Sequence, residues 1–486
     1  MVFLPACHQP APLPAAPRAA ALPARQLQID IDGIVGQPAF DHTSWGIVVR
    51  SLRTNETLYA MNAQKLMMPA SNLKIVTLAA AAAALGWNYS YETTVHATGA
   101  VNGGVLDGDL VVTGSGDPSI TWIDGASDRL FADWASRIKA AGIRTIAGRI
   151  VGDGSAFDGE ELGFGWSWDD LQDDYAAGID ALQFNENAAR LTITPGPAAG
   201  TSAGLAVEPS TTGLSVECAV TTAAAGAGAS IRMRRLPGSA RLVVRGSIPV
   251  GSRPLVELVS VDDPAGFFVR SLRAALIANG IDVRGGAVDG VSGDDANHSR
   301  GSGAQLVEYR SPPLSQLAVR LMKDSQNQYA ETLLKTLGRA AGAPNAAAGR
   351  AAVQTALARW GVASSDLVQR DGSGLSRYDY VTAEALTTVL VQVDRDPALR
   401  GPFEASLPIA GRDGTLANRM KGTAAEGNAR AKTGSMSNVR GLSGYVSTAD
   451  GEPLVFSILA NNFDVAPGSI TAAADAIVVR LATFRR

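Results

Sequence analysis

The stretch L-M-M-P-A-S-N-L-K-I-V-T-L-A-A-A-A-A-A-L-G, residues 66 to 86, combines a helix-start signal with a very apolar helix. Pro69 marks the entry, Gly86 marks the end, and the residues between them favour helix. Because this span is apolar on nearly every side, we expect a buried central helix. Ser71 and Lys74 stand three residues apart at its start, so their side chains share one face. A lysine whose pKa is lowered by burial or by another cation can act as the base for a serine nucleophile.

Two later segments each contain a short polar pattern that occurs once in the chain. Ser325-Gln326-Asn327 lies between two helical stretches, where polar residues often only form a turn. Lys432-Thr433-Gly434 opens an apolar strand, although the chain has only seven lysines against 35 arginines. A second Ser-x-x-Lys pattern, at residues 136 to 139, is expected on the surface of an amphipathic helix. The order Ser-x-x-Lys, Ser-x-Asn, Lys-Thr-Gly resembles the signature of β-lactamases and penicillin-binding proteins.

Composition excludes several other classes of protein. A chain of 486 residues should form two or three domains, and 46% hydrophobic with 18% charged residues is typical of a soluble globular protein. The net charge of −4 and the absence of a basic cluster argue against a nucleic-acid partner. There is no apolar run of about 18 residues and no phosphate-binding loop. Four scattered histidines and two lone cysteines predict neither a zinc site nor a Ser-His-Asp triad, so no metal or cofactor is expected.

The first 25 residues carry six prolines, and we expect a disordered tail there. Within it, L-P-A-C at residues 4 to 7 resembles the end of a bacterial lipoprotein signal whose upstream part is missing. The alternatives are therefore a lipid anchor at Cys7 and a plain Pro/Ala linker.

The order of the expected helices and strands along the chain predicts one domain that is interrupted by insertions. A hairpin is expected at 44–62, and short strands with glycine turns begin at about residue 91. A helix–glycine–strand pattern occurs twice, at 130–152 and 266–288, and the Val/Thr/Gly-rich stretch 189–250 has no convincing helix. Helices are expected at 314–337, 347–360 and 382–394, followed by a hairpin at 440–460 and a helix at 468–484. The predicted domains are 26–91 with 297–486, an insertion of 92–188 with 251–296, and an all-β unit of 189–250 inside that insertion.

Four further segments resemble one family within this group. They are D-G-S-G-L-S-R (371–377), V-V-T-G-S-G-D-P (111–118), G-W-S-W-D-D (165–170) and A-L-Q-F-N-E-N (181–187). The chain from about residue 30 to 486 resembles the DacB-type, class C low-molecular-mass penicillin-binding proteins, including an insertion of about 200 residues that serine β-lactamases lack. The resemblance implies an α/β (α+β) fold, in which a penicillin-binding/serine β-lactamase-like catalytic domain carries two nested, mainly β inserted domains. It also implies a D-alanyl-D-alanine carboxypeptidase, often with endopeptidase activity.

The resemblance assigns a role to each residue of the three motifs. Ser71 would attack the carbonyl of the penultimate D-Ala, and neutral Lys74 would accept its proton. Ser325 would relay the proton to the leaving amine, while Asn327 would hold the substrate amide and steady Lys74. Lys432 would lower the pKa of Lys74 and attract the terminal carboxylate.

The same resemblance implies the substrate-binding residues and the partners. Thr433 would hydrogen-bond the carboxylate, Gly434 would let the substrate approach the strand, and the backbone N–H groups of Ser71 and Ser435 would form the oxyanion hole. Arg377 and Asp170 would line the pocket for the stem-peptide side chain; the alternatives are a surface arginine and a loop acid. The implied partners are peptidoglycan stem peptides and acylating β-lactams, in the periplasm or cell envelope, with a homodimer left open. A β-lactamase or esterase, and a non-catalytic peptidoglycan-binding scaffold, are the competing hypotheses.

Overall fold

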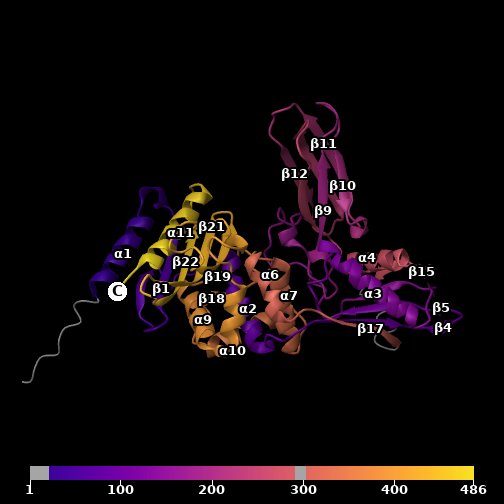
Figure 1. Ribbon diagram of the computed structural model, residues 1–486, viewed down its shortest axis with the longest axis horizontal. Helices are drawn as coiled ribbons and strands as arrows, with labels where there is room; N and C mark the ends of the chain where they lie inside the picture. Colours follow the sequence, from indigo (N-terminus) through magenta and orange to yellow (C-terminus); the bar gives the residue numbers. More distant parts are fainter. Residues whose placement is uncertain (1–20, 291–302) are drawn as a thin grey trace, which may run out of the picture.

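The computed structural model describes residues 21–290 and 303–486 and contains a five-stranded antiparallel sheet (Figure 1). The strand order β2-β1-β22-β21-β20 joins the two ends of the chain in one sheet. The bounds are β1 Ser44–Ser51, β2 Thr57–Met61, β20 Arg430–Met436, β21 Val439–Ser447 and β22 Pro453–Asn461. β1 pairs with β22 along its whole length, from Ser44 opposite Asn461 to Ser51 opposite Leu454. Both predicted hairpins are confirmed, and β20 lies at an edge of the sheet.

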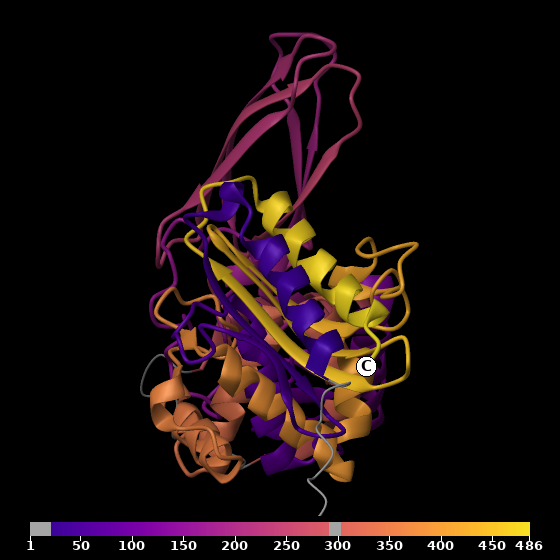
Figure 2. The ribbon, with the colours of Figure 1, turned by 90° about the vertical axis from the view of Figure 1, so that its left-hand side faces the viewer.

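Helices cover both faces of this sheet. On one face, α1 and α11 lie side by side (Figure 2) and bury an apolar layer against the strands. On the other face, α2 packs among the remaining helices, and its residues 73–82 are all buried, as expected from its apolar sequence. The bounds are α1 Ala21–Val35, α2 Leu73–Leu85, α6 Leu314–Lys323, α7 Asn327–Ala340, α8 Ala346–Arg359, α9 Ala383–Arg395, α10 Pro397–Ser406 and α11 Pro467–Thr483. A two-stranded ladder of β18 Leu367–Val368 and β19 Tyr380–Val381 lies between α8 and α9 in the chain.

Helix α1 corrects the prediction for the start of the chain. It begins at Ala21, so the prediction of an unstructured tail was wrong for residues 21–25. Pro23 stands in the first turn, where its missing N–H leaves no intrahelical hydrogen bond unmade. Leu27, Ile31 and Val35 repeat every four residues and are buried against the sheet and α11. Residues 1–20, with Cys7, lie outside the described part of the chain.

Within the described residues, the first insertion forms two further sheets and carries the helices α3 and α4. The sheet orders are β16-β8-β6-β3-β17 and β15-β7-β5-β4. The repeated helix–strand pattern is confirmed: α3 and β7–β8 correspond to α4 and β15–β16, and the equivalent strands pair in parallel. The bounds are β3 Glu92–Ala97, β4 Ala100–Asn102, β5 Val105–Asp107, β6 Leu110–Gly114, α3 Ala126–Ala140, β7 Thr145–Ile146, β8 Ile150–Asp153, α4 Pro264–Ala278, β15 Asp282–Val283, β16 Ala287–Asp289 and β17 Ala304–Arg310.

The innermost insertion is built of strands and projects from the rest of the molecule (Figure 1). Its two three-stranded sheets have the orders β10-β9-β14 and β11-β13-β12. The bounds are β9 Ala188–Thr194, β10 Gly204–Glu208, β11 Ser215–Ala223, β12 Ser230–Arg235, β13 Arg241–Pro249 and β14 Leu255–Ser260. β14 follows residue 250 yet pairs with β9, and β17 follows residue 297 yet pairs with β3. Each of these strands thus pairs with a strand on the other side of a predicted domain boundary. The sequence could not predict these pairings, because local sequence does not encode which sheet a strand joins. Residue 297 itself lies outside the described ranges.

Polar contacts join the insertion to the helices of the catalytic part. Arg320 on α6 pairs with both carboxylate oxygens of Glu186, at 2.7 and 2.8 Å. Gln183 Nε2 donates to Thr332 Oγ1 on α7 at 3.0 Å. No helix in the described ranges is both long and apolar enough to cross a membrane.

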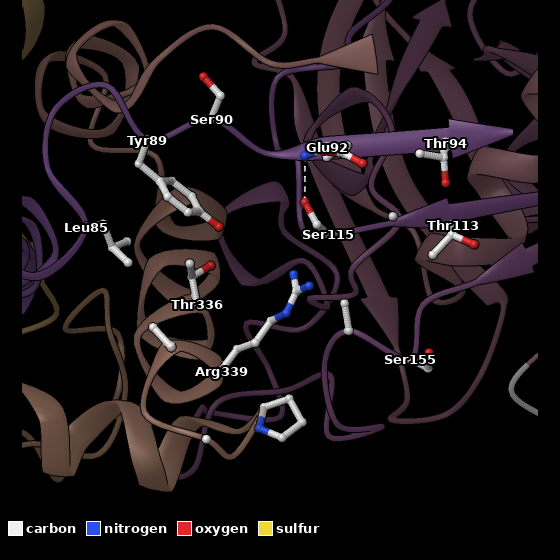
Figure 3. A pocket seen from close by; sticks show the side chains of 15 residues that line it. Leu85, Tyr89, Ser90, Glu92, Thr94, Thr113, Ser115, Ser155, Thr336 and Arg339 are labelled. Atoms are coloured by element: carbon white, nitrogen blue, oxygen red, sulfur yellow. Dashed lines mark hydrogen bonds between the residues drawn. The ribbon is translucent and has the colours of Figure 1, made fainter. Parts of the chain in front are cut away.

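A cavity of about 850 Å³ lies at the same junction, with the side chains of Tyr89 and Arg339 at its wall (Figure 3). Leu85 and Arg339, which line it, stand near the ends of α2 and α7, whereas Lys74 and Asn327 stand at the beginnings of these helices. This cavity is therefore remote from the residues that the motifs single out, and we do not assign it to the substrate.

Candidate active site

The segment that carries Ser71 is held in an unusual backbone conformation. Ser71 lies in a 3₁₀ turn, Ala70–Asn72, that leads directly into α2. Ala70 has φ of 46°, a left-handed conformation that alanine adopts only when its surroundings enforce it. The side chain of Asn461 on β22 helps to hold this conformation, because its Oδ1 accepts from Met68 N at 2.7 Å and its Nδ2 donates to Met68 O at 3.1 Å. Ser71 is thereby fixed at the sheet and half-buried.

Lys74 is fully buried, and its Nζ lies within hydrogen-bonding distance of three oxygens. Its Nζ lies 2.8 Å from Ser71 Oγ, 2.5 Å from Asn327 Oδ1 and 3.0 Å from the carbonyl oxygen of Ser373. Burial lowers the pKa of Lys74 to about 7, although the acids Asp371 and Glu331 act in the opposite direction. A substantial share of Lys74 is therefore neutral near pH 7, with a lone pair available to Ser71.

Ser325 lies between α6 and α7 and Asn327 begins α7, as expected from their position between two helical stretches. The helical range 314–337 is divided in two because Ser325 adopts φ of 62°. Gln326 caps α7 by accepting from Gln328 N at 3.3 Å. Asn327 Nδ2 donates to the carbonyl oxygen of Tyr175 at 2.7 Å. A backbone atom of the insertion thus orients the amide that contacts Lys74.

Lys432 lies on edge strand β20 and contacts Ser325. Its Nζ lies 2.8 Å from Ser325 Oγ and 3.0 Å from the carbonyl oxygen of Thr433. Burial, and then the charge of Lys74, hold the pKa of Lys432 well below its usual range. The expectation that Lys432 lowers the pKa of Lys74 thus differs from the structure, in which burial is the leading cause for both lysines.

The residues after Lys432 lie along the same strand. Thr433 donates from Oγ1 to Thr415 Oγ1 at 2.8 Å. A Cβ on Gly434 would lie 2.6 Å from the carbonyl oxygen of Pro69, so this glycine allows the strand to approach the Ser71 segment. The close approach visible in the structure is therefore to the nucleophile's own turn, whereas the sequence predicted one to the substrate. Ser435 is exposed to solvent.

Sequence reasoning missed the loop that holds Lys74 from behind. Asp371 accepts from Gly374 N and Ser376 N at 2.7 Å each and from Trp166 Nε1 at 2.9 Å. Glu331 accepts from the backbone N–H groups of Gly372 and Ser373 at 2.8 Å each, and burial followed by the charge of Asp371 raises its pKa to about 8. These bonds fix the carbonyl of Ser373 on Lys74. The D-G-S-G-L-S-R stretch carried this signal, because an aspartate before glycine and serine commonly closes such a turn.

Arg377 and Asp170 lie near one another but form no ion pair among the residues that the structure describes. Arg377 is exposed, and its Nη1 lies 3.5 Å from the carbonyl oxygen of Ser437. Asp170 accepts from the Tyr175 hydroxyl at 3.0 Å. Burial raises the pKa of Asp170, and the charge of Arg377 opposes that rise. Both residues therefore belong to the region of Tyr175, whose carbonyl contacts Asn327.

The structure brings residues of the three motifs into one group of three, Ser71 with Lys74 and Asn327, and one pair, Ser325 with Lys432. Such a site supports acyl transfer through a serine ester, with lysine as the base. The fold and the site together define an active-site serine enzyme of the penicillin-binding and β-lactamase type.

The comparisons with known proteins agree with that class. The model of the D-Ala-D-Ala carboxypeptidase 3 (S13) family matches residues 27–484. A D-alanyl-D-alanine carboxypeptidase of Actinomadura sp. (strain R39) is 37% identical over 471 residues, which cover 94% of this chain and 85% of the relative. The chain belongs to the D-Ala-D-Ala carboxypeptidase 3 (S13) family.

Solved structures show the same fold. The crystal structure of penicillin binding protein 4 (dacB) from Haemophilus influenzae has a TM-score of 0.81 at 24% identity, covering 93% of this chain and 99% of that one. The same protein complexed with a β-lactam has a TM-score of 0.75 at 22% identity, covering 94% and 100%. A variant form of a predatory endopeptidase from Bdellovibrio bacteriovorus has a TM-score of 0.53 at 16% identity, covering 91% and 94%.

Proposed function

We propose that the protein is a serine D-Ala-D-Ala carboxypeptidase that cleaves peptidoglycan stem peptides and is acylated by penicillin. The observation that carries this proposal is the hydrogen bond between Ser71 Oγ and a fully buried Lys74 whose pKa is lowered to about 7. Membership of a D-Ala-D-Ala carboxypeptidase family supports the choice of substrate over a general esterase.

The first half of the reaction forms the acyl-enzyme. Neutral Lys74 takes the proton of Ser71 as Oγ attacks the carbonyl carbon of the penultimate D-Ala. The bond from carbon to the leaving nitrogen then breaks, and the proton held by Lys74 is relayed through the Ser325 hydroxyl to the departing D-Ala amine, so that Lys74 is neutral again and Ser325 is unchanged. In the second half, water gives a proton to Lys74 as it attacks the ester, the bond from carbon to Ser71 Oγ breaks, and Lys74 returns the proton to Oγ.

Strand β20 supplies the substrate-binding surface in this proposal. It is an edge strand, so a peptide can pair with it as an additional strand. Lys432 and Thr433 then face the terminal carboxylate, and the backbone N–H groups of Ser71 and Ser435 form the oxyanion hole. Each such donor is typically worth about 3–4 kcal/mol in the transition state.

The surroundings of the cleft bear on which stem peptide is cleaved. Arg377 and Asp170 provide opposite charges near the cleft, and we assign them to the side chain of the residue that precedes D-Ala. Cross-linked peptides have the same bond type, so DD-endopeptidase activity is part of the proposal. The expected location is the periplasm or cell envelope, and the lipid anchor at Cys7 and the homodimer remain predictions.

Covalent labelling by a fluorescent penicillin tests the nucleophile. The wild type should be labelled and Ser71→Ala should not be, whereas Ser136→Ala should be labelled normally. Ser136 is a matched control, because it begins the second Ser-x-x-Lys pattern and is exposed on α3. Labelling that survives Ser71→Ala and disappears in Ser136→Ala refutes the assignment.

The lifetime of the penicilloyl adduct separates the peptidase from a β-lactamase. A slow decay with release of D-Ala from a D-Ala–D-Ala peptide is expected, whereas rapid turnover of penicillin contradicts the proposal. Digestion of purified monomeric and dimeric muropeptides then measures carboxypeptidase against endopeptidase activity. An active enzyme that leaves the dimers intact removes the endopeptidase part.

A further inference from the structure

One face of the projecting β-unit is strongly basic. Residues 231 to 245, I-R-M-R-R-L-P-G-S-A-R-L-V-V-R, hold five arginines, so the sequence-based statement that the chain has no basic cluster was wrong here. Side chains alternate between the two faces of a strand. Four of the arginines consequently share the exposed face of β12 and β13: Arg232, Arg234, Arg241 and Arg245. We call these four residues the arginine face.

The fifth arginine points the other way and has a structural role. Arg235 is buried, and it donates from Nη1 to Asp262 Oδ1 at 2.9 Å and from Nη2 to the carbonyl oxygen of Leu171 at 2.5 Å. These bonds tie the lower end of β12 to the segment that follows Asp170. The arginine face is thereby held in a fixed relation to the loop 165–170.

The charges on the arginine face are not balanced within the protein. The strand register places Arg232 directly opposite Arg245, and like charges in opposing positions destabilise a sheet. Glu217 on β11 pairs with Arg241 and lies 4.0 Å from Arg245. Among the described residues, Arg232 and Arg234 form no ion pair with a carboxylate. Four guanidinium groups and one carboxylate leave an excess of three positive charges.

The shape of this surface fits an extended ligand. The four arginines and the exposed Leu236 line a depression of about 890 Å³. At its lower end, the guanidinium of Arg234 stacks over Trp168 at 5.0 Å. Trp168 belongs to the loop that carries Asp170, whose neighbour Tyr175 contacts Asn327 through its carbonyl. One end of the arginine face therefore rests on the loop that also carries Asp170.

We propose that the arginine face binds the carboxylate groups of a peptidoglycan strand, on stem peptides adjacent to the one in the active site. Guanidinium groups bind carboxylates through paired hydrogen bonds, and alternate residues on a strand stand about 7 Å apart. Each of these contacts is weak by itself. When one polymer makes several of them, the first contact raises the effective concentration of the polymer at the others, and the overall affinity increases. The excess positive charge, and the contact of Arg234 with the loop that also carries Asp170, are the observations that favour the enzyme's own acidic polymer. This inference rests on the proposed function.

Sedimentation with purified sacculi tests the proposal in the full-length protein. Arg232→Gln/Arg245→Gln should raise the apparent Kd for sacculi about tenfold, with no loss of thermal stability because an opposed charge pair is removed. The matched control is Arg284→Gln/Arg310→Gln, two exposed arginines that already pair with acids, and its affinity should equal that of the wild type. Wild-type affinity for sacculi in the Arg232→Gln/Arg245→Gln variant overturns the proposal.

Two further measurements identify the ligand and separate this inference from the proposed function. Amidation of the carboxylates of the sacculi should abolish the difference between wild type and variant. A difference that survives amidation but disappears after removal of phosphate polymers overturns the carboxylate assignment. Hydrolysis of a soluble D-Ala–D-Ala tripeptide should be equal in both proteins, and an inactive wild type refutes the proposed function whatever the sedimentation shows.

Discussion

Replacing Gly434 by alanine tests whether strand β20 positions the nucleophile. The added Cβ would lie 2.6 Å from the carbonyl oxygen of Pro69 and 2.7 Å from Asn72 Nδ2, whereas Cβ contacts below 3.0 Å are essentially never found and ordinary contacts begin at 3.4 Å. The turn that carries Ser71 must therefore retreat by about 0.4–0.8 Å. A displacement of about 1 Å costs about 10²-fold in rate, so we expect acylation to slow about tenfold. Overpacking should also cost about 1–3 kcal/mol of the free energy of unfolding.

Two measurements check this prediction. The second-order rate constant of acylation by a fluorescent penicillin reports the geometry, and denaturant unfolding reports the stability. Gly468→Ala is the control, because a Cβ at the start of α11 would meet nothing within 4 Å, and it should acylate at the wild-type rate. The reasoning is refuted by a Gly434→Ala variant that acylates as fast as the wild type with unchanged stability.

Three other perturbations probe the base, the loop behind it and the first helix. The acylation rate should rise about tenfold per pH unit below the Lys74 pKa of about 7 and then level off, because only neutral lysine accepts the proton; a rate that is flat between pH 5.5 and 8 contradicts this. Asp371→Asn removes a charge that favours protonated Lys74, so the midpoint of that profile should move to lower pH, and an unchanged midpoint excludes the electrostatic role. Ile31→Ala should lower the free energy of unfolding, measured with denaturant, by about 2–5 kcal/mol, because Ile31 is buried. The side chain of Ile29 is 53% exposed, so Ile29→Ala should change this free energy by no more than about 0.5 kcal/mol. Equal losses in the two variants contradict the packing of α1.

The sequence predicted the elements that carry the site because their signals are local. The apolar span after Pro69 predicts α2, and the strand after Lys432 predicts β20, with little dependence on the rest of the chain. The order of the three motifs then identified Ser325 and Asn327, although their local sequence is also typical of an ordinary turn. The structure brings all of these side chains together.

The remaining contacts of the site could not be predicted from residue types. Lys74 and Asn327 contact the backbone carbonyls of Ser373 and Tyr175, and a carbonyl is present in every residue. The pairing of β17 with β3 joins residues about 210 positions apart, which no local pattern encodes. The arginine face is a different case, because the alternation in I-R-M-R-R was readable, but a net charge of −4 averaged over the whole chain obscured it.

The two buried lysines have similar neutral partners in the free protein, and the proposed mechanism gives them different tasks once a substrate binds. The immediate acceptors around Lys74 are neutral, namely a serine hydroxyl, an amide oxygen and a carbonyl, so burial keeps a neutral fraction that can act as base. Lys432 likewise contacts only a hydroxyl and a carbonyl in the free protein, and its pKa is lowered as well. In the proposed mechanism, a substrate that ends in a carboxylate places a negative charge beside Lys432, which favours its ammonium form and offsets the cost of burial. A ligand without that carboxylate would give Lys432 no such partner, so Lys432 would favour substrates with a terminal carboxylate while Lys74 remains available to Ser71.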